Sequence, residues 1–480
     1  MTASDLAALS PLITIALMVL AVMLAIAFYR HHLVTFILTL AGITLAFLML
    51  PVAAAQAPRQ VTALLILDRY ALFYMGLLLI ASFVVALLSY GYLDRHEGAR
   101  EEFYLLLLLA TLGGAALVAS SHFAAVFLGL ETLSVALYVL IAYPRTRARS
   151  IEAGIKYLIL AAASAAFMLF GMALVYAETG TMEFARLAGV LAGGGARQGL
   201  LLTGQAMIFI GVGFKLAVAP FHVWAPDVYE GAPAPVTAFI ATLSKGAMFA
   251  LLLRYFTGLG DQAYQSFFLV VAVIAIASMF VGNLLALVQT NVKRLLACSS
   301  IAHLGYLLVA FLAGGSLGST AAAFYLAAYF VTILGAFGVI AALSRRERDA
   351  DSLDDYRGLF WRRPGLASVF SAALLSLSGI PLTAGFMGKL YVLIAGVRSA
   401  LWLMVVALAV NTVIGFYYYL RIAFNMFRDV PAEEVSLTAP SLSLAGSVAL
   451  VALTLSLVWV GVYPSPLIHT IQSAVAGVVP

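Results

Sequence analysis

The sequence predicts an all-α, polytopic membrane protein with about fourteen transmembrane helices. Hydrophobic residues make up 64% of the 480 residues and charged residues only 10%, whereas a soluble globular protein has about 25% charged residues. The apolar residues are also grouped into runs that are long enough to cross a bilayer as helices, which takes about 20 residues. These two observations exclude an ordinary soluble protein.

Each apolar run of about 18 or more residues predicts one transmembrane helix. The expected helices lie near residues 9–28, 33–53, 70–91, 103–119, 123–142, 155–177, 201–224, 236–256, 264–288, 295–313, 319–343, 365–396, 400–424 and 441–463. The first run is expected to be retained, because Asp5 and no basic residue precedes it, unlike a cleaved signal peptide.

The basic residues predict that both termini lie on the outer side of the membrane, because cytoplasmic loops carry an excess of Lys and Arg. The expected cytoplasmic loops and helix ends carry Arg30, Arg95, Arg100, Arg145, Arg147, Arg149, Lys293, Arg294, Arg345, Arg346, Arg348, Arg357, Arg362, Arg363, Arg421 and Arg428. The outer side carries only Arg59, Arg69, Arg186, Arg197, Arg254 and Arg398. The net charge of +5 is therefore interpreted as an orientation signal, and no nucleic-acid binding is expected.

The sequence offers no redox group or metal site of its own. The single cysteine, Cys298, excludes an intrachain disulfide and an iron–sulfur cluster. The seven histidines show no paired helical spacing for a metal or haem. The GVG at Gly211 follows no strand and lacks a third glycine, so it is no dinucleotide fingerprint. We expect no cofactor on this chain.

Two of the expected helices are interrupted by proline. The seventh carries Pro220 and Pro226, and the twelfth carries Pro381 within SGIPLTAGF. Broken helices at corresponding places in two halves are typical of inverted-repeat transporters. The two are five helices apart, and because five is odd, the second unit must cross the membrane in the opposite sense. We therefore predict inverted five-helix repeats of helices 4–8 and 9–13; the alternative is that prolines are simply common in membrane helices.

This organisation divides the chain into four segments. Residues 1–102 hold the first three helices, 103–258 the first repeat, 259–425 the second repeat and 426–480 the last helix. The most polar stretch, 344–364, is expected to be a solvated cytoplasmic loop. Within it we expect a short amphipathic helix around Leu353 to Leu359, with Ser352 and Asp355 as a capping box.

Charged residues inside the membrane are costly and usually functional. Glu131 is the only carboxylate deep within an expected helix, and Lys215, in the same repeat and at similar depth, is its natural partner. The alternative is a fixed ion pair that only joins two helices. Function is favoured, because buried ion pairs are poor stabilisers.

Five further residues could belong to a proton relay. Lys245 and Lys389 are central in their helices, which argues against snorkelling to the membrane surface. Lys156 lies near the cytoplasmic start of helix 6, so relay and snorkelling are equally consistent with its position. His222 could extend a chain of water molecules, because a neutral imidazole both donates and accepts hydrogen bonds. The same role is less favoured for His303, because a lone histidine in a helix is more often structural.

Three long motifs resemble one known family. The stretch FKLAVAPFHVWAPDVYEGAPAPVTAFIATLSK, residues 214–245, is similar to the central signature of the antiporter-like subunits of respiratory complex I, the proton-pumping NADH:quinone oxidoreductase. NLLALVQTNVKRLLACSSIAHLGY at 283–306 and GIPLTAGFMGKLYVL at 379–393 follow in the family's order. The resemblance covers nearly the whole chain.

The resemblance implies fourteen helices, two inverted five-helix units and a proton half-channel in each. The residues that match positions of the family are Glu131, Lys215, Lys245, Lys389, Lys156 and His222. The second half has no carboxylate equivalent to Glu131, and His303 is the nearest polar candidate on helix 10. The two half-channels are therefore expected to differ chemically.

The resemblance also implies a proton-translocating subunit of a multi-subunit enzyme in a bacterial inner membrane. NADH, FMN, iron–sulfur clusters and quinone are expected in partner subunits, and the expected partners are the other membrane subunits, including neighbouring antiporter-like ones, and the lipid bilayer. Protons are expected to enter from the cytoplasm near Lys215 and Glu131, pass Lys245 toward Lys389, and leave on the outer side. The alternative function is a cation/proton antiporter that exchanges sodium for protons, which the fold alone cannot distinguish.

Overall fold

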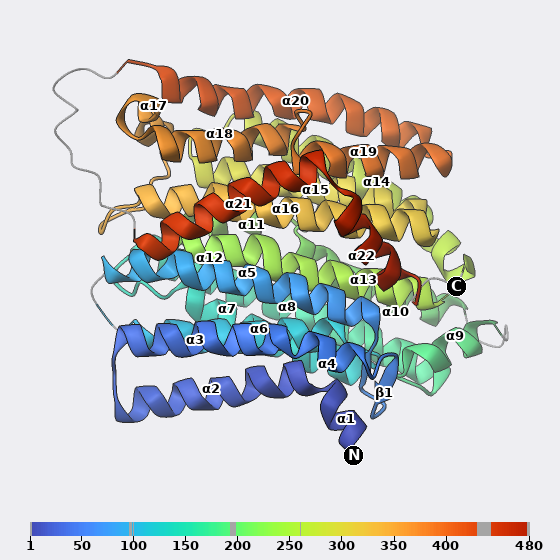
Figure 1. Ribbon diagram of the computed structural model, residues 1–480. Helices are drawn as coiled ribbons and strands as arrows, with labels where there is room; N and C mark the ends of the chain where they lie inside the picture. The colour runs from blue at the N-terminus through green and yellow to red at the C-terminus, as the bar shows by residue number, and fades with distance from the viewer. Residues whose placement is uncertain are drawn as a thin grey trace.

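The computed structural model describes residues 2–95, 98, 100–192, 198–259, 261–429 and 443–477. Helices that run side by side dominate this part of the chain (Figure 1). The first half holds α1 (Ala3–Ala8), α2 (Ser10–Phe28), α3 (His32–Leu48), α4 (Leu50–Ala54), β1 (Arg59–Val61), β2 (Leu65–Leu67), α5 (Arg69–Asp94), α6 (Glu101–Val118), α7 (Phe123–Ile141), α8 (Ala148–Thr179), α9 (Phe184–Ala192), α10 (Gln198–Leu216), α11 (Trp224–Gly231), α12 (Ala234–Phe239), the π-helix η1 (Ile240–Ser244) and α13 (Lys245–Leu259). The second half holds α14 (Asp261–Leu287), α15 (Val292–Ala313), α16 (Gly315–Leu343), the 3₁₀ helix η2 (Leu353–Tyr356), α17 (Leu359–Arg362), α18 (Pro364–Ser378), α19 (Ala384–Arg398), α20 (Trp402–Phe427), α21 (Leu444–Val462) and α22 (Ser465–Val475).

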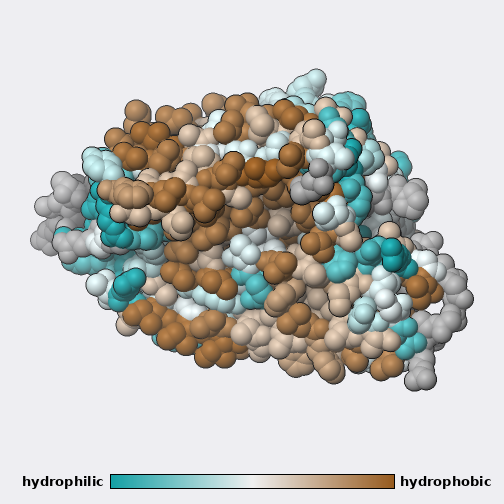
Figure 2. All heavy atoms as spheres, turned by 90° about the horizontal axis from the view of Figure 1, so that it is seen from below, coloured by the Kyte–Doolittle hydropathy of each residue, from teal (hydrophilic) through white to brown (hydrophobic). Residues whose placement is uncertain are grey.

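The predicted all-helical membrane architecture is confirmed. Thirteen helical segments within the described ranges are long and apolar enough to cross a membrane. The twelfth of the fourteen expected helices, near residues 365–396, is present as two shorter ones, α18 and α19. Hydrophobic side chains form a broad band between two hydrophilic ends on the face drawn in Figure 2, as expected for a surface that contacts lipid tails.

The helices differ in how much of their surface faces outward. The segment from α12 to α13 and the whole of α15 are buried, and α16 is nearly so. A helix that is apolar all round must be covered on all sides by other helices. These three segments therefore form the centre of the molecule, and α2, α3, α20 and α21 lie at its edges, with large exposed apolar side chains.

Both predicted breaks are present. α10 ends at Leu216 before Pro220, and the indole Nε1 of Trp224 donates a hydrogen bond to the Phe214 carbonyl, 2.9 Å away. α18 ends at Ser378 before Pro381, where Gly379 has the left-handed φ of 87° that favours glycine. Each break leaves backbone carbonyls without helical partners inside the protein.

Three details of the sequence prediction are corrected. The loop at 344–364 has the expected capping box on Ser352 and Asp355, but it forms η2 and then α17 instead of one amphipathic helix. A two-stranded hairpin, β1 with β2, was not expected, because three-residue strands have too few residues to show a period. The short helix α22 also follows the last expected transmembrane helix.

The two termini lie at the same end of the helices (Figure 1). The turns after α2, α5, α7 and α16 lie at the opposite end, which we call the arginine-rich end because Arg30, Arg95, Arg145 and Arg345 follow these helices. This arrangement agrees with the prediction that both termini lie on the same side of the membrane. The inverted relation of the repeats and the four segment boundaries stay predictions.

A buried ion pair joins helices at the end that carries the termini. Arg254 of α13 donates two hydrogen bonds of 2.8 Å to the carboxylate of Asp68, which also caps the start of α5. Both side chains are only 7% exposed. The sequence analysis interpreted Arg254 as an orientation signal, but its charge is neutralised inside the protein.

A second buried carboxylate lies at the arginine-rich end, in the loop after α16. Asp349 accepts hydrogen bonds from Lys293 (2.7 Å), Arg147 (3.1 Å) and the hydroxyl of Tyr92 (2.8 Å). Burial alone would raise the pKa of Asp349, but the attraction of Lys293 and Arg147 lowers it to about 2. Loop residues that the sequence predicts to be solvated are therefore fixed to α5, α8 and α15.

We predict that Asp68→Asn destabilises the protein by about 3–5 kcal/mol, because it leaves the Arg254 guanidinium buried without a counter-charge. The measurement is thermal unfolding of the assembled, purified protein in detergent. Glu183→Gln is the control, since it removes the exposed pair with Arg186, which should contribute little. Equal shifts in melting temperature for the two variants would contradict the prediction.

We predict a pH-dependent effect of Asp349→Asn. The pKa of Asp349 lies below its ordinary value of 3.8, at about 2, so its ionised form stabilises the fold above about pH 4, and this stabilisation is lost as the pH falls toward 2. The difference in melting temperature between wild type and variant should be constant above pH 4 and shrink below it. A difference that grows as the pH falls below 4 would contradict the assignment.

Candidate functional site

Three lysines and one histidine lie in the centre of the helix bundle. Lys215 is in the last turn of α10, Lys245 begins α13, His303 is in the middle of α15, and Lys389 is in α19. All four side chains are buried. We call these four residues the central polar chain. Their burial excludes snorkelling for Lys245 and Lys389.

The amine of Lys215 lies among hydroxyl groups of α7 and α8. It donates hydrogen bonds to Ser134 of α7 (2.7 Å) and to Tyr157 of α8 (3.2 Å), and it lies 5.0 Å from the centre of the Tyr157 ring. The Ser134 hydroxyl in turn donates to the carbonyl of Leu130. Lys215 is therefore bound by polar groups that are not charged.

The predicted close pair of Lys215 and Glu131 is wrong for this structure. No ion pair within 4 Å joins them among the described residues, and Ser134, one turn further along α7, occupies the contact with the amine. Glu131 is partly exposed, and its Oε1 is buried without a hydrogen-bond partner. Glu131 and Ser134 lie on the same side of α7 and differ in depth by one turn, and the sequence does not fix the relative depth of two helices to within one turn.

Lys245 lies deepest in the bundle, and its amine donates a 2.7 Å hydrogen bond to the hydroxyl of Ser300 in α15. Tyr329 of α16 donates to the same hydroxyl at 2.7 Å, and the Tyr229 ring centre is 5.4 Å from the amine. The π-helix η1 immediately precedes Lys245. Single π-helical turns occur frequently at functional sites.

His303 connects the groups around Lys245 with those around Lys389. Its two ring nitrogens contact the hydroxyls of Tyr325 (2.7 Å) and Tyr419 (3.1 Å). Its ring centre is 5.4 Å from the rings of both Tyr329 and Tyr306. A cavity of about 10 Å³ beside His303 has roughly the size of one water molecule. His303 is thus part of a polar network and not an isolated structural histidine.

Lys389 binds the break in the twelfth helix. Its amine donates to the carbonyls of Leu377 (2.9 Å) and Ser378 (3.0 Å), the last residues of α18, and lies 5.4 Å from the ring centre of Tyr306. A cation at a helix C-terminus is stabilised by the helix dipole. Lys215 precedes the break in its helix, whereas Lys389 follows the break in its own, so the two lysines are not equivalent.

Two of the predicted residues lie apart from the central polar chain. Lys156 is 44% exposed and pairs with Glu152 (2.7 Å) and Asp227 (2.9 Å) near the arginine-rich end. His222 is half-buried in the turn between α10 and α11. Neither contacts one of the three buried amines by a hydrogen bond in the part of the chain that the structure describes.

Six hydroxyl groups that bind the central polar chain were not expected from the sequence. These are Ser134, Tyr157, Ser300, Tyr325, Tyr329 and Tyr419. Their only sequence signal is a position inside an apolar helix, and serine and tyrosine are too common there to single out these six.

The arrangement can hold and pass protons. Amines, an imidazole and hydroxyls follow one another from α10 to α19. Each of these groups carries a hydrogen that it can donate, and in its neutral form each can also accept a proton or a hydrogen bond. Over the ranges that the structure covers, none of the three amines has a carboxylate within 4 Å, and no group of three metal-ligating side chains occurs. Intramembrane ionisable residues of this kind mark proton relays and ion pathways.

Comparison with known proteins identifies the family of this chain. The family model for "NADH:quinone oxidoreductase/Mrp antiporter, TM" matches residues 120–415. A protein of Nitrosospira multiformis named NADH-quinone oxidoreductase subunit N is 53% identical over 98% of this chain and 97% of its own. One of Ectopseudomonas mendocina with the same name is 48% identical over the same shares of the two chains.

Solved structures share the architecture. A chain of respiratory complex I from Thermus thermophilus is 32% identical, with a TM-score of 0.82 over 96% of this chain and 99% of that one. A chain of the Mrp complex from a Dietzia species, 19% identical with a TM-score of 0.86 over 100% and 98% of the two chains, shows the fold alone.

A family model matches more than half of the chain, and two relatives are about half identical over nearly the full length, in agreement with the resemblance of the three motifs. This chain therefore belongs to the antiporter-like membrane subunits of NADH:quinone oxidoreductase.

Proposed function

We propose that this chain translocates protons as a membrane subunit of a bacterial NADH:quinone oxidoreductase. The observation that carries the proposal is the central polar chain, in which Lys215, Lys245, His303 and Lys389 lie buried among hydroxyls and carbonyls without carboxylate partners. Such groups are costly inside a membrane and are retained where they serve transport.

In this proposal a proton enters near Lys215 and Glu131, passes Lys245 and His303, and leaves beyond Lys389. Serine and tyrosine hydroxyls supply the short steps, such as Lys245 to Ser300 to Tyr329. Water molecules supply the longer steps, as beside His303. Glu131 lies one helical turn from Ser134, the partner of Lys215, so a change in the charge of Glu131 alters the field at Lys215.

The proposed orientation places the arginine-rich end in the cytoplasm and both termini on the outer side of the inner membrane, in agreement with the excess of basic residues. The proposed partners are the other membrane subunits of the complex, including neighbouring antiporter-like subunits. NADH oxidation and quinone reduction take place in partner subunits with their FMN and iron–sulfur clusters, and they supply the driving force. This chain holds no cofactor in the proposal.

A cation/proton antiporter is the competing function, because the matching family model also describes Mrp antiporters. The two are distinguished in inverted membrane vesicles. Proton uptake that follows NADH oxidation and does not depend on sodium supports the proposed function. Proton movement that requires a sodium gradient and persists without NADH would favour the antiporter.

Lys245→Ala should lower the rate of NADH-driven proton pumping by about a hundredfold, the lower range for loss of a positioned acid–base group. Arg145→Ala is the control, because Arg145 is exposed in a turn at the arginine-rich end. Pumping is measured in vesicles with equal amounts of assembled complex. Similar losses in the two variants would refute a relay role for Lys245.

Lys215→Arg should keep the fold and the positive charge but impair pumping. A guanidinium does not release its proton at accessible pH, so a step that needs Lys215 to give up a proton fails. The comparison is proton pumping per NADH oxidised, in variant and wild type at matched assembly. Undiminished pumping would mean that Lys215 provides only a fixed charge.

Glu131→Gln should slow pumping while the complex still assembles, because glutamine keeps the size of the side chain and removes its charge. The matched variant is Glu183→Gln, whose carboxylate forms an exposed pair outside the central polar chain. Wild-type pumping and turnover in assembled Glu131→Gln complex would remove Glu131 from the pathway.

A further inference from the structure

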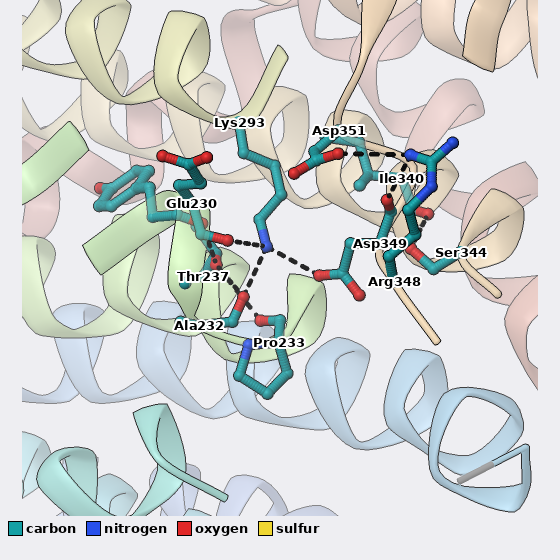
Figure 3. Close-up of polar contacts among 12 residues, drawn as sticks. Glu230, Ala232, Pro233, Thr237, Lys293, Ile340, Ser344, Arg348, Asp349 and Asp351 are labelled. Carbon is teal, nitrogen blue, oxygen red and sulfur yellow. Dashed lines mark hydrogen bonds and ion pairs between the residues drawn. The ribbon is translucent and has the colours of Figure 1, made fainter. Parts of the chain in front are cut away.

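A buried lysine outside the central polar chain binds the break between α11 and α12. Lys293, in the first turn of α15, is 1% exposed. Its amine donates to the carbonyls of Glu230 (2.9 Å) and Ala232 (2.6 Å) and to the carboxylate of Asp349 (2.7 Å). Figure 3 shows the amine between these three oxygens. All three donor hydrogens of the ammonium group are used.

The acceptors of Lys293 belong to the segment that leads into Lys245. Ala232 caps the C-terminal end of α11, and α12 and η1 continue from there without interruption to Lys245. The hydroxyl of Thr237 donates to the carbonyls of Tyr229 and Pro233, both at 3.2 Å, across the same break. The ring of Tyr229, in α11, is the one that lies 5.4 Å from the Lys245 amine.

The same face of α15 contacts Lys245 itself. Ser300, the acceptor of the Lys245 amine, follows Lys293 by seven residues. Residues seven apart lie two turns apart on one side of a helix. One rigid helix therefore holds the start of the segment through Lys293 and its functional amine through Ser300.

Asp349 keeps Lys293 in this place. It is the only charged acceptor of the Lys293 amine in the described part of the chain, and it is itself bound by Arg147 and Tyr92. With its pKa near 2, Asp349 stays ionised at physiological pH and does not exchange protons there. The contact is a fixed attachment and not a step of the relay.

We infer that Lys293, held by Asp349, is a positioning residue for Lys245: it fixes the break between α11 and α12 against α15, so that the Lys245 amine stays on Ser300. The inference rests on the proposed function and adds two residues to it. A simpler role, in which the buried pair only stabilises the fold, predicts no special dependence on Ser300. The positioning role predicts that substitutions of Lys293 and Ser300 have coupled effects on pumping, whereas the purely structural role predicts independent effects.

The test is a double-mutant cycle of Lys293→Met and Ser300→Ala in the complete complex. NADH-driven proton pumping and NADH oxidation are measured in vesicles at matched assembly. Methionine keeps the length of the stem and removes the ammonium group. Lys293→Met alone should lower pumping about tenfold or more, since misplacing a reacting group by about 1 Å can reduce a rate up to about a hundredfold. In the Ser300→Ala background, Lys293→Met should cause little further loss of pumping.

The control variant is Arg186→Met, whose side chain is 72% exposed and pairs with Glu183, outside these contacts, so that its loss should leave pumping unchanged. If Lys293→Met lowers pumping by the same factor in the wild-type and Ser300→Ala backgrounds, the inference is overturned and the Lys293–Asp349 pair is purely structural. If Lys293→Met does not assemble, Asp349→Asn takes its place in the same cycle, because asparagine keeps an acceptor oxygen and the size of the side chain.

Failure of this inference is distinguishable from failure of the proposed function. If Lys245→Ala retains pumping, the relay itself is refuted. If Lys245→Ala stops pumping but Lys293→Met and Ser300→Ala act independently, only the positioning role is refuted.

Discussion

Placing amines in the interior of a membrane protein is the constraint on which the rest of the structure depends. Water is scarce there, so each donor hydrogen must find an acceptor within the protein. Lys215 and Lys245 are bound by serine and tyrosine hydroxyls, and Lys389 by the carbonyls that the break at Pro381 sets free. The broken helix is thus both a turn in the chain and a source of acceptors.

Buried charged side chains have charged partners at the ends of the bundle but only neutral partners in its centre. At one end Arg254 meets Asp68, and at the other Lys293 meets Asp349, each at 2.7–2.8 Å. These pairs fix helices of distant sequence against one another. The central amines contact only neutral oxygens, so the energy of their charged forms depends on small changes nearby. Ion pairs that hold the helix ends in place, combined with central amines that have no charged partner, are suited to proton transfer without movement of the helices.

The two broken helices are alike in outline and unlike in chemistry. Lys215 stands before its break and binds hydroxyls, whereas Lys389 stands after its break and binds carbonyls. Glu131 lies in α7, before the first break, and His303 with its two tyrosines lies among α15, α16 and α20, near the second break. The Lys389 amine donates to carbonyls and not to a hydroxyl, so in the proposed relay the steps near Lys389 depend more on His303 and on water.

The sequence by itself determined the membrane class, the helices, both breaks and the family, because apolar runs, prolines and long motifs are properties of continuous segments. It also identified every buried lysine of the central polar chain, since a charge within an apolar run is visible without a structure. Only the tertiary structure decided which side chains meet. The expected pair of Lys215 and Glu131 gave way to Ser134, and Lys293, interpreted as a loop charge, proved to be buried on Asp349. Contacts between distant segments depend on the position of each helix along its axis and on its rotation about that axis, and hydropathy specifies neither closely enough.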